Sequence, residues 1–244
     1  MGEYLNFFSA ICRWWRETFT HHGFLAMAQQ CSSVLNTFLR ESMPSHRRQR
    51  YGDIDFDWDH RVDTTSATVG WRDRLLGVLN SPYQPTEESL FHQMISSLDI
   101  DFRNFTFIDI GSGKGRALLM ASHYPFRRIL GVELLPALHQ VAEQNIAKYK
   151  NELQFCHKVE SICADARDFV FPVEPIVLYL FNPLPADGLA HVLNNLERSL
   201  QLGSRHVYVL YHNAEHEHLL TESAFLQKIG GSHQYSLFSN SPSK

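Results

Sequence analysis

Short apolar stretches and helical patterns alternate along the second half of the chain, from about residue 104 onward. The fourth stretch (PIVLYLF) is apolar on both faces, as the central strand of a parallel sheet should be. Proline at position 136 is typical of the first turn of a helix. The pattern predicts strands at 105–110, 128–133, 161–164, 175–181 and 206–211, and helices at 116–122, 136–149 and 186–201.

The spacing of these strands indicates how they are connected. Three of the four intervals between strand starts leave room for a crossover helix, whereas the interval from 161 to 175 allows only a short helix or a loop. We therefore expect an α/β fold with a Rossmann-like, doubly wound and mostly parallel sheet. The tail over 225–238 fits either a hairpin or a helix that ends in glycine before a last strand.

The first 50 residues have a different pattern, with apolar residues recurring every three or four positions. This spacing predicts two amphipathic helices within 3–40. The basic run at 46–50 is interpreted as a solvated linker rather than an interfacial or nucleic-acid patch. The chain is thus divided into a helical N-terminal cap (1–50), a substrate-lid segment (51–103) and a Rossmann-like core (104–244). The two apolar stripes are Leu5, Phe8, Cys12, Trp15 and Phe19, then Phe24, Met27, Cys31, Val34 and Phe38.

Acidic and apolar residues alternate in the stretch YGDIDFDWDHRVD, residues 51–63. A period of two suits an edge strand with its carboxylates outward, and equally a loop laid over a pocket. Tyr51, Trp58 and Trp71 could form an aromatic wall over a substrate or simply pack between cap and core. A helix is expected over 84–98, with Thr86 as its N-cap.

Composition narrows the class of protein. The 244 residues are 44% hydrophobic and 12% aromatic, which excludes disorder over most of the length. The formal net charge is −4, and residues 51–244 carry 16 basic against 23 acidic residues, which argues against a nucleic-acid partner. The four cysteines lack metal or disulfide spacing, so we expect a cytoplasmic protein with its thiols packed in the core. The uncharged stretch 18–39 is too polar for a membrane span.

The sharpest chemical signal is a glycine-rich turn between the first strand and its helix, Asp109–Arg116 (DIGSGKGR). Glycine allows the backbone to approach a ligand closely, and a helix N-terminus favours a carboxylate. A nicotinamide-dependent oxidoreductase is disfavoured, because the dinucleotide motif G-x-G-x-x-G would need glycine where Arg116 stands. The P-loop pattern fails as well. We expect Lys114 and Arg116 to be surface or helix charges.

Three further polar positions follow strand ends. Glu133 lies 22 positions after Gly111, a spacing that suits an acid holding ribose hydroxyls, although it could be a solvated acid. Asp165 could accept a hydrogen bond from an adenine amino group or cap a helix. Asn182, before Pro183, is either a catalytic contact or a turn residue.

Together, the segments FIDIGSGKGR, GVE, ADA and LFNPLP make residues 104–212 resemble the class I S-adenosylmethionine-dependent methyltransferases, in a bacterial branch of unknown substrate. The resemblance implies S-adenosyl-L-methionine as cofactor and S-adenosyl-L-homocysteine as product. It places the methionine part on the glycine turn, the ribose on Glu133 and the adenine on Asp165, with a threonine-containing segment (Thr64, Thr65 and Tyr83) at the mouth. The implied cofactor-binding residues are Asp109, Gly111, Ser112, Gly113, Gly115, Glu133, Leu134, Asp165, Ala166, Asn182 and Thr65.

The implied reaction is methyl transfer to a nitrogen or oxygen of an unidentified acceptor, with Asn182 and His212 as candidate catalytic residues. Family members acting on amines carry a second proline and an aromatic residue after Asn-Pro, where this chain has Leu184-Pro185. His212, or an acid within 53–63, is the candidate for removing a proton.

The sequence also suggests two other interpretations. Histidines at 212, 216 and 218 invite a metal site, but Asn213 stands where the zinc-protease motif needs glutamate, and a polar helix start is favoured, with no metal. The alternative function is a non-catalytic cofactor-binding module, whose N-terminal apolar helices serve self-association or hold a partner protein.

Overall fold

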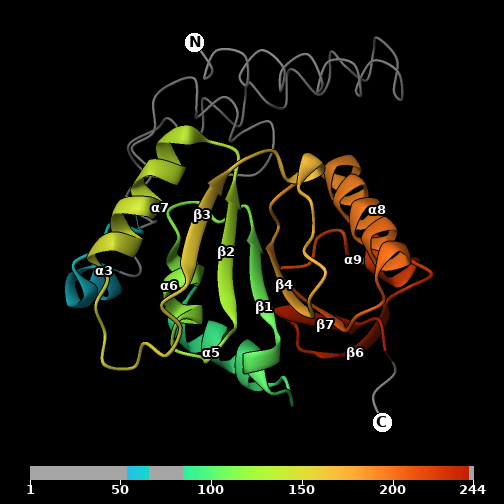
Figure 1. Cartoon of the computed structure of the whole chain (residues 1–244), viewed down its shortest axis with the longest axis horizontal. Helices are drawn as coiled ribbons and strands as arrows, with labels where there is room; N and C mark the ends of the chain where they lie inside the picture. The colour runs from blue at the N-terminus through green and yellow to red at the C-terminus, as the bar shows by residue number, and fades with distance from the viewer. Residues whose placement is uncertain (1–53, 66–84, 242–244) are drawn as a thin grey trace.

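The computed structural model describes residues 54–65 and 85–241, which are built around one seven-stranded sheet (Figure 1). The strands lie in the order β3-β2-β1-β4-β5-β7-β6. The first five pair in parallel, and β7 lies antiparallel between β5 and β6. This is the Rossmann-like, mostly parallel sheet that the sequence predicts. The strands are β1 (Thr106–Ile110), β2 (Arg128–Glu133), β3 (Val159–Cys163), β4 (Ile176–Phe181), β5 (Val207–His212), β6 (Gln227–Gly231) and β7 (Tyr235–Ser239).

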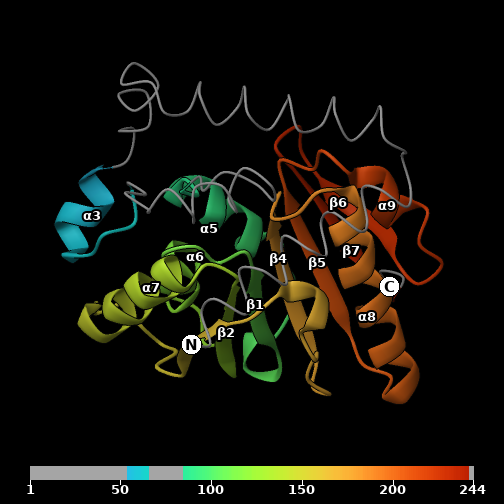
Figure 2. The ribbon, with the colours of Figure 1, turned by 90° about the horizontal axis from the view of Figure 1, so that it is seen from above.

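Helices cover both faces of this sheet. Successive side chains of a strand point to opposite faces, so Phe107 packs with α5 and α6 while Ile108 packs with α8. Figures 1 and 2 show α7 and α8 on opposite sides of the strands. The helices are α3 (Ile54–His60), α5 (Glu88–Ser96), α6 (Arg116–Ala121), α7 (Pro136–Lys148), α8 (Ala186–Leu202) and α9 (Glu217–Thr221), with 3₁₀ turns η1 (Phe102–Asn104) and η2 (Ala166–Asp168).

The winding of the chain reverses between β1 and β4. From β1 the sheet grows through β2 to β3 on one side, and β4 and β5 then extend the other side. Open α/β sheets bind their ligands outside the carboxyl ends of the strands at such a reversal. Because β1 to β5 are parallel, the residues that follow them all lie at this one edge.

In the stretch with alternating acids, residues 54–60 form helix α3, so neither the edge strand nor the loop expected there describes these residues. In a strand, Phe56 and Trp58 would share one face, but Phe56 is 3% exposed and Trp58 is 83% exposed. Helical spacing instead places the Phe56 and His60 rings edge to face, with centroids 4.5 Å apart. Trp58 is therefore not packed in the core.

Thr86 is not the N-cap of α5. That position is held by Glu87, whose side chain makes no capping bond. The Thr86 side chain is buried instead, where its hydroxyl lies 2.9 Å from that of Tyr179. The other elements agree with the sequence to within two residues at each end, and of the two alternatives for the tail the structure has the hairpin.

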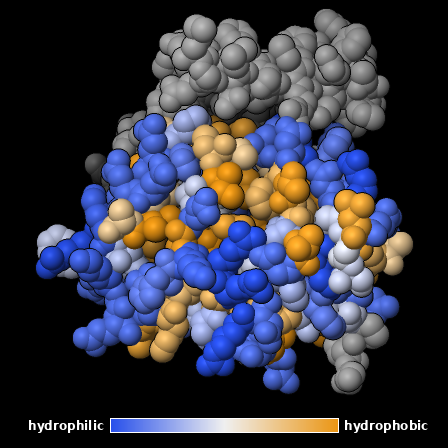
Figure 3. All heavy atoms as spheres, viewed as in Figure 1, coloured by the Kyte–Doolittle hydropathy of each residue, from blue (hydrophilic) through white to orange (hydrophobic). Residues whose placement is uncertain are grey.

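Several expectations lie outside the described residues: the two N-terminal helices, the basic run, and the aromatic residues at 51, 71 and 83. In residues 54–65 and 85–241, no helix is both long and apolar enough to cross a membrane. Cys156 is buried as expected, but Cys163 is exposed at the end of β3. The face in Figure 3 is largely hydrophilic, with small apolar groups between, which is ordinary for a protein surface.

Candidate functional site

The glycine turn after β1 needs its glycines for two separate reasons. Gly111, Gly113 and Gly115 have φ of 77°, 54° and 84°, in the left-handed region that L side chains rarely adopt. A Cβ on Gly111 would also lie 2.7 Å from the Cβ of Pro183, and one on Gly115 would lie 3.2 Å from that of Ala142. The turn is thus pressed against the segment after β4 on one side and against α7 on the other.

The carboxylate of Glu133 binds the backbone of this turn. Its two oxygens accept the N–H groups of Gly113 and Leu135, each at 2.8 Å. Burial raises the pKa of Glu133, while these backbone N–H groups act in the opposite direction. A carboxylate offers about four acceptor positions, so capacity remains beyond these two bonds. The end of β2 and the glycine turn are therefore joined into one unit.

Asp109 is a second buried acid, placed on the central strand β1. It is 4% exposed, and no hydrogen bond from the described residues reaches its carboxyl group. Burial, followed by the nearby charge of Glu133, raises its pKa to about 8. Asp109 is consequently protonated for the most part at neutral pH.

Asp165 caps η2, the role that was weighed against adenine binding. Its Oδ1 accepts the backbone N–H of Arg167 at 2.9 Å, and its Oδ2 accepts from the Arg167 guanidinium at 2.7 Å. Both side chains are largely buried. Ala166 follows inside the core. The N–H of Ala164, the residue before Asp165, donates to the backbone oxygen of Glu133 at 3.0 Å. Asp165 therefore lies close to the end of β2.

Lys114 and Arg116 were expected to be surface or helix charges, and neither lies at the surface, although Arg116 is the first residue of helix α6. They are 3% and 2% exposed. The Lys114 Nζ lies 2.6 Å from Asp63 Oδ1, and the Arg116 guanidinium lies 4.2 Å from the centre of the Phe56 ring. Arg116 Nη1 also donates to Thr64 Oγ1 at 3.3 Å. The segment around α3 covers these cations, which is why they are buried.

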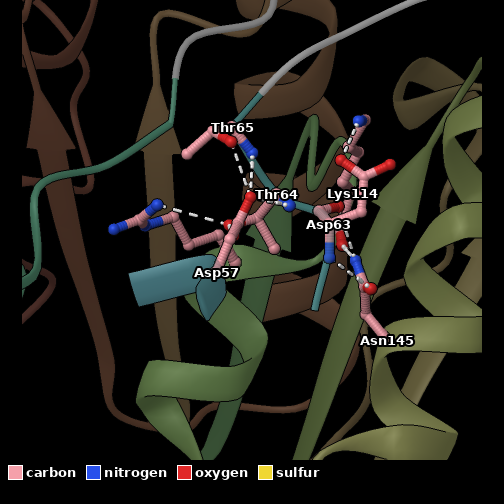
Figure 4. Close-up of polar contacts among 7 residues, drawn as sticks. Asp57, Asp63, Thr64, Thr65, Lys114 and Asn145 are labelled. Carbon is pink, nitrogen blue, oxygen red and sulfur yellow. Dashed lines mark hydrogen bonds and ion pairs between the residues drawn. The ribbon is translucent and has the colours of Figure 1, made fainter. Parts of the chain in front are cut away.

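Asp57 and Asn145 complete this arrangement. The sequence predicted Asp57 only as one of the acids of 53–63 that could remove a proton, and it assigned no role to Asn145. The Asp57 carboxylate accepts the N–H and hydroxyl of both Thr64 and Thr65 (Figure 4). The Asn145 amide binds the backbone of Asp63 through both its oxygen and its nitrogen, and its nitrogen also donates to the Lys114 oxygen (Figure 4). Residues 57–65 are thus fastened to the glycine turn and to α7. One sequence signal was available: α6 (RALLMA) is apolar on every side apart from its arginine.

Asn182 and His212 end neighbouring strands. Asn182 has φ of 47°, and its side-chain oxygen accepts the Tyr211 hydroxyl at 3.1 Å. His212 is paired with Phe181 in the sheet and stacks on its ring, with centroids 3.9 Å apart. Burial lowers the pKa of His212 to about 4.

The histidines at 216 and 218 do not share a helix with His212. His212 ends β5, whereas His216 precedes α9. The helical face on which a metal site would depend is therefore absent. In the part of the chain that the structure describes, no group of three or more His, Cys, Asp or Glu side chains could hold a metal ion.

No protein-family model matches the chain, and no curated protein matches it. Solved structures similar to it include the ribosomal protein L11 methylase from Lactobacillus delbrueckii subsp. bulgaricus (18% identity, 62% of this chain and 76% of that one, TM-score 0.43). TrmN from Thermus thermophilus has 18% identity over 62% of this chain and 48% of that one, with a TM-score of 0.45. An RNA methyltransferase from Salinibacter ruber in complex with S-adenosyl-L-homocysteine has 20% identity, 64% and 91% coverage, and a TM-score of 0.36. At these identities and scores, interpretation of the site depends on this chain's own residues.

Proposed function

We propose that this protein is an S-adenosylmethionine-dependent methyltransferase acting on a nitrogen or oxygen of an acceptor that is still to be identified. The observation that carries the proposal is the glycine turn, with three left-handed glycines, Pro183 against Gly111, and the Glu133 carboxylate bonded beneath Gly113. A turn that only connected a strand to a helix would not need this combination.

The residues present suit this cofactor. The Ser112 hydroxyl is buried and has no hydrogen-bond partner among the described residues, and Glu133 keeps acceptor capacity for ribose hydroxyls. Asp165 is held at the neighbouring strand end, where the resemblance places the adenine amino group. We assign the methionine part to the backbone of the glycine turn, flanked by Leu134 and Ala166 farther along the edge.

The cofactor supplies a sulfonium-bound methyl group that is already electrophilic. The protein's contribution is then to orient the acceptor and exclude water, which supplies up to about 7–11 kcal/mol when reacting atoms are well aligned. Asn182 and His212, at adjacent strand ends, are the residues proposed to face the acceptor. Residues 57–65 would cover the site, and the bonds of Asp63 to Lys114 and Asn145 support this role.

Calorimetry with the full chain tests cofactor binding. S-adenosylhomocysteine should give a saturable heat, and Glu133→Gln should weaken affinity by about 10- to 100-fold, since a hydrogen bond to a charged group is lost. Glu160→Gln, an exposed glutamate on the adjacent β3, is the matched control and should bind like wild type. Absence of heat up to about 1 mM ligand, or tighter binding of reduced nicotinamide dinucleotide, would overturn the proposal.

The acceptor is sought with tritiated methyl donor and fractionated cell extract, sorted into protein, nucleic-acid and metabolite pools. Label in one pool identifies the acceptor class, and Glu133→Gln should lower that labelling. A protein that binds S-adenosylhomocysteine but labels no pool would contradict methyl transfer while leaving the cofactor assignment intact.

A further inference from the structure

A chain of buried hydroxyl groups leads from α5 to the sheet edge and ends on His212. The Thr86 Oγ1 lies 2.9 Å from the Tyr179 Oη, and this oxygen lies 2.9 Å from the His212 Nδ1. The three side chains are 4%, 1% and 8% exposed. They come from the residues before α5, from β4 and from β5, so the fold brings them together across 126 positions of sequence.

The direction of the hydrogen bonds follows from the protons available. If the imidazole donated to Tyr179, one buried proton would be left without an acceptor. It would be the Thr86 proton if Tyr179 donated to Thr86, and the Tyr179 proton if Thr86 also donated to the Tyr179 oxygen. Among the described residues, Tyr179 is the one hydrogen-bond partner of the Thr86 hydroxyl. Burying an unsatisfied donor costs about 1–3 kcal/mol. In the opposite direction, Thr86 donates to Tyr179 and Tyr179 donates to Nδ1, and every buried proton is satisfied.

The ionisation of the two rings agrees with this direction. Burial raises the pKa of Tyr179 well above its usual value, so the hydroxyl keeps its proton. Burial lowers the pKa of His212 to about 4, and the nearby charge of Glu87 only partly opposes this. The imidazole is therefore neutral at pH 7 and carries one N–H. Since Nδ1 accepts from Tyr179, that N–H is on Nε2.

We propose that Thr86 and Tyr179 are positioning residues that fix His212 as a hydrogen-bond donor through Nε2, so that it orients an oxygen of the methyl acceptor instead of removing a proton. The part of this inference that concerns the acceptor rests on the proposed function, whereas the tautomer does not. Phe181 covers a face of the ring, and Nε2 makes no hydrogen bond to a described residue. The acceptor class is accordingly a molecule with a carbonyl, carboxylate or phosphoryl oxygen beside its nucleophile.

The role also accounts for the proton that methyl transfer releases. The acceptor's nucleophile bonds to the methyl carbon as the bond from that carbon to sulfur breaks. The methylated acceptor then loses its proton to bulk solvent when it leaves the site, because His212 already carries its proton on Nε2 and its Nδ1 is occupied by Tyr179. This differs from the general-base role that the sequence suggested for His212.

Nuclear magnetic resonance of the full chain with ¹⁵N-labelled histidine tests the tautomer without cofactor or acceptor. His212 is assigned by the signal lost in His212→Asn, and we expect its proton on Nε2 at pH 7. Tyr179→Phe removes the donor to Nδ1, so the tautomer with the proton on Nδ1 should become populated. Tyr208→Phe, on the neighbouring strand β5 and with no hydroxyl bond to a described residue, is the matched control. A wild-type His212 protonated at Nδ1 would overturn the proposal.

Thr86→Val provides an independent test. If Thr86 donates to Tyr179, its loss leaves Tyr179 still donating to Nδ1, and the tautomer does not change. If the bonds run the other way, Tyr179 loses its acceptor, turns to His212 and changes the tautomer. Unchanged signals therefore support the proposal, and a switch contradicts it.

The donor role is tested by tritiated-methyl transfer to the extract pool that wild type labels. Removing one hydrogen bond with His212→Leu should slow labelling about 10-fold, whereas His212→Gln, whose amide N–H can still donate, should lose less than about 3-fold. A general base would cost about 10²- to 10⁴-fold in both variants. Equal losses of that size would exclude orientation by a donor, and if no pool is labelled by wild type, the fault lies with the proposed function and not with the tautomer.

Discussion

Lys114 and Asp63 form a 2.6 Å ion pair across 51 positions of sequence, and its two ends lie in very different surroundings. The lysine side chain is 3% exposed, whereas the aspartate side chain is 59% exposed. The ion pair thus joins the buried Lys114 of the glycine turn to an exposed residue of the segment that covers this turn. Lys114 serves as an anchor point for residues 57–65.

Removing the charge of Asp63 should loosen this anchor. Asp63→Asn should lower the free energy of unfolding by about 1–2 kcal/mol, between the values for exposed pairs and for buried ones. Urea unfolding measures the difference. Asp59→Asn, an exposed aspartate on α3, should stay within about 0.5 kcal/mol of wild type. If both variants are equally stable, the pair holds nothing in place.

Arg116→Met should weaken the packing of residues 54–65 against the rest of the protein. The methionine fills much of the space of the arginine stem, but the contact of the guanidinium with Phe56 and its bond to Thr64 are lost. A desolvated cation–π contact contributes about 2 kcal/mol, so amide exchange in this segment should speed up by roughly 10- to 30-fold. Hydrogen exchange followed by mass spectrometry measures it. Arg103→Met, at an exposed arginine, is the control, and equal exchange rates in the two variants would contradict the role.

The sheet could be predicted because its signals are local. β2 occupies 128–133 as predicted, since its apolar run is bounded by Arg128 and Glu133, and α7 begins at the predicted proline. Parallel pairing then places all strand ends at one edge, so the candidate residues came together without any long-range information.

The errors concern residues whose environment is set by distant parts of the chain. Phe56 packs on Arg116, which lies 60 positions away in the sequence. The alternation of acidic and apolar residues around Phe56 therefore did not predict its helical backbone. The sequence predicts an N-cap at Thr86 because threonine often is one, but Tyr179 provides this residue with a buried partner. Similarly, the roles of Asp57 and Asn145 depend on loops that only the folded chain brings together.

Gly111→Ala should damage both stability and binding. A left-handed backbone costs a residue with a Cβ about 1–2 kcal/mol, and the new Cβ would lie 2.7 Å from that of Pro183. Urea unfolding and titration with S-adenosylhomocysteine should both show the loss. Gly203→Ala is the control, because its Cβ would meet nothing within 4 Å. Unchanged affinity in Gly111→Ala would show that the turn does not contact the ligand.

Asp109 should make stability depend on pH in a direction opposite to that of an ordinary salt-bridged acid. Its folded-state pKa of about 8 lies above the usual value of 3.8, so the folded chain holds a proton that the unfolded chain releases. The contribution of Asp109 to stability is therefore fully present below about pH 4. It is lost as pH rises toward 8, by up to about 1.4 kcal/mol per pH unit. Asparagine does not titrate, so the stability of Asp109→Asn should increase relative to that of wild type as pH rises over this range.

Urea unfolding of wild type and Asp109→Asn at several pH values measures that gain as a difference, in which the titration of all shared groups cancels. The difference should grow from about pH 4 to pH 8 and level off above it. Asp99→Asn, at an exposed aspartate on the residues after α5, should show no such growth. A difference that is constant with pH would mean that Asp109 is ionised in the folded protein, and that its carboxylate is stabilised at the centre of the sheet despite its burial.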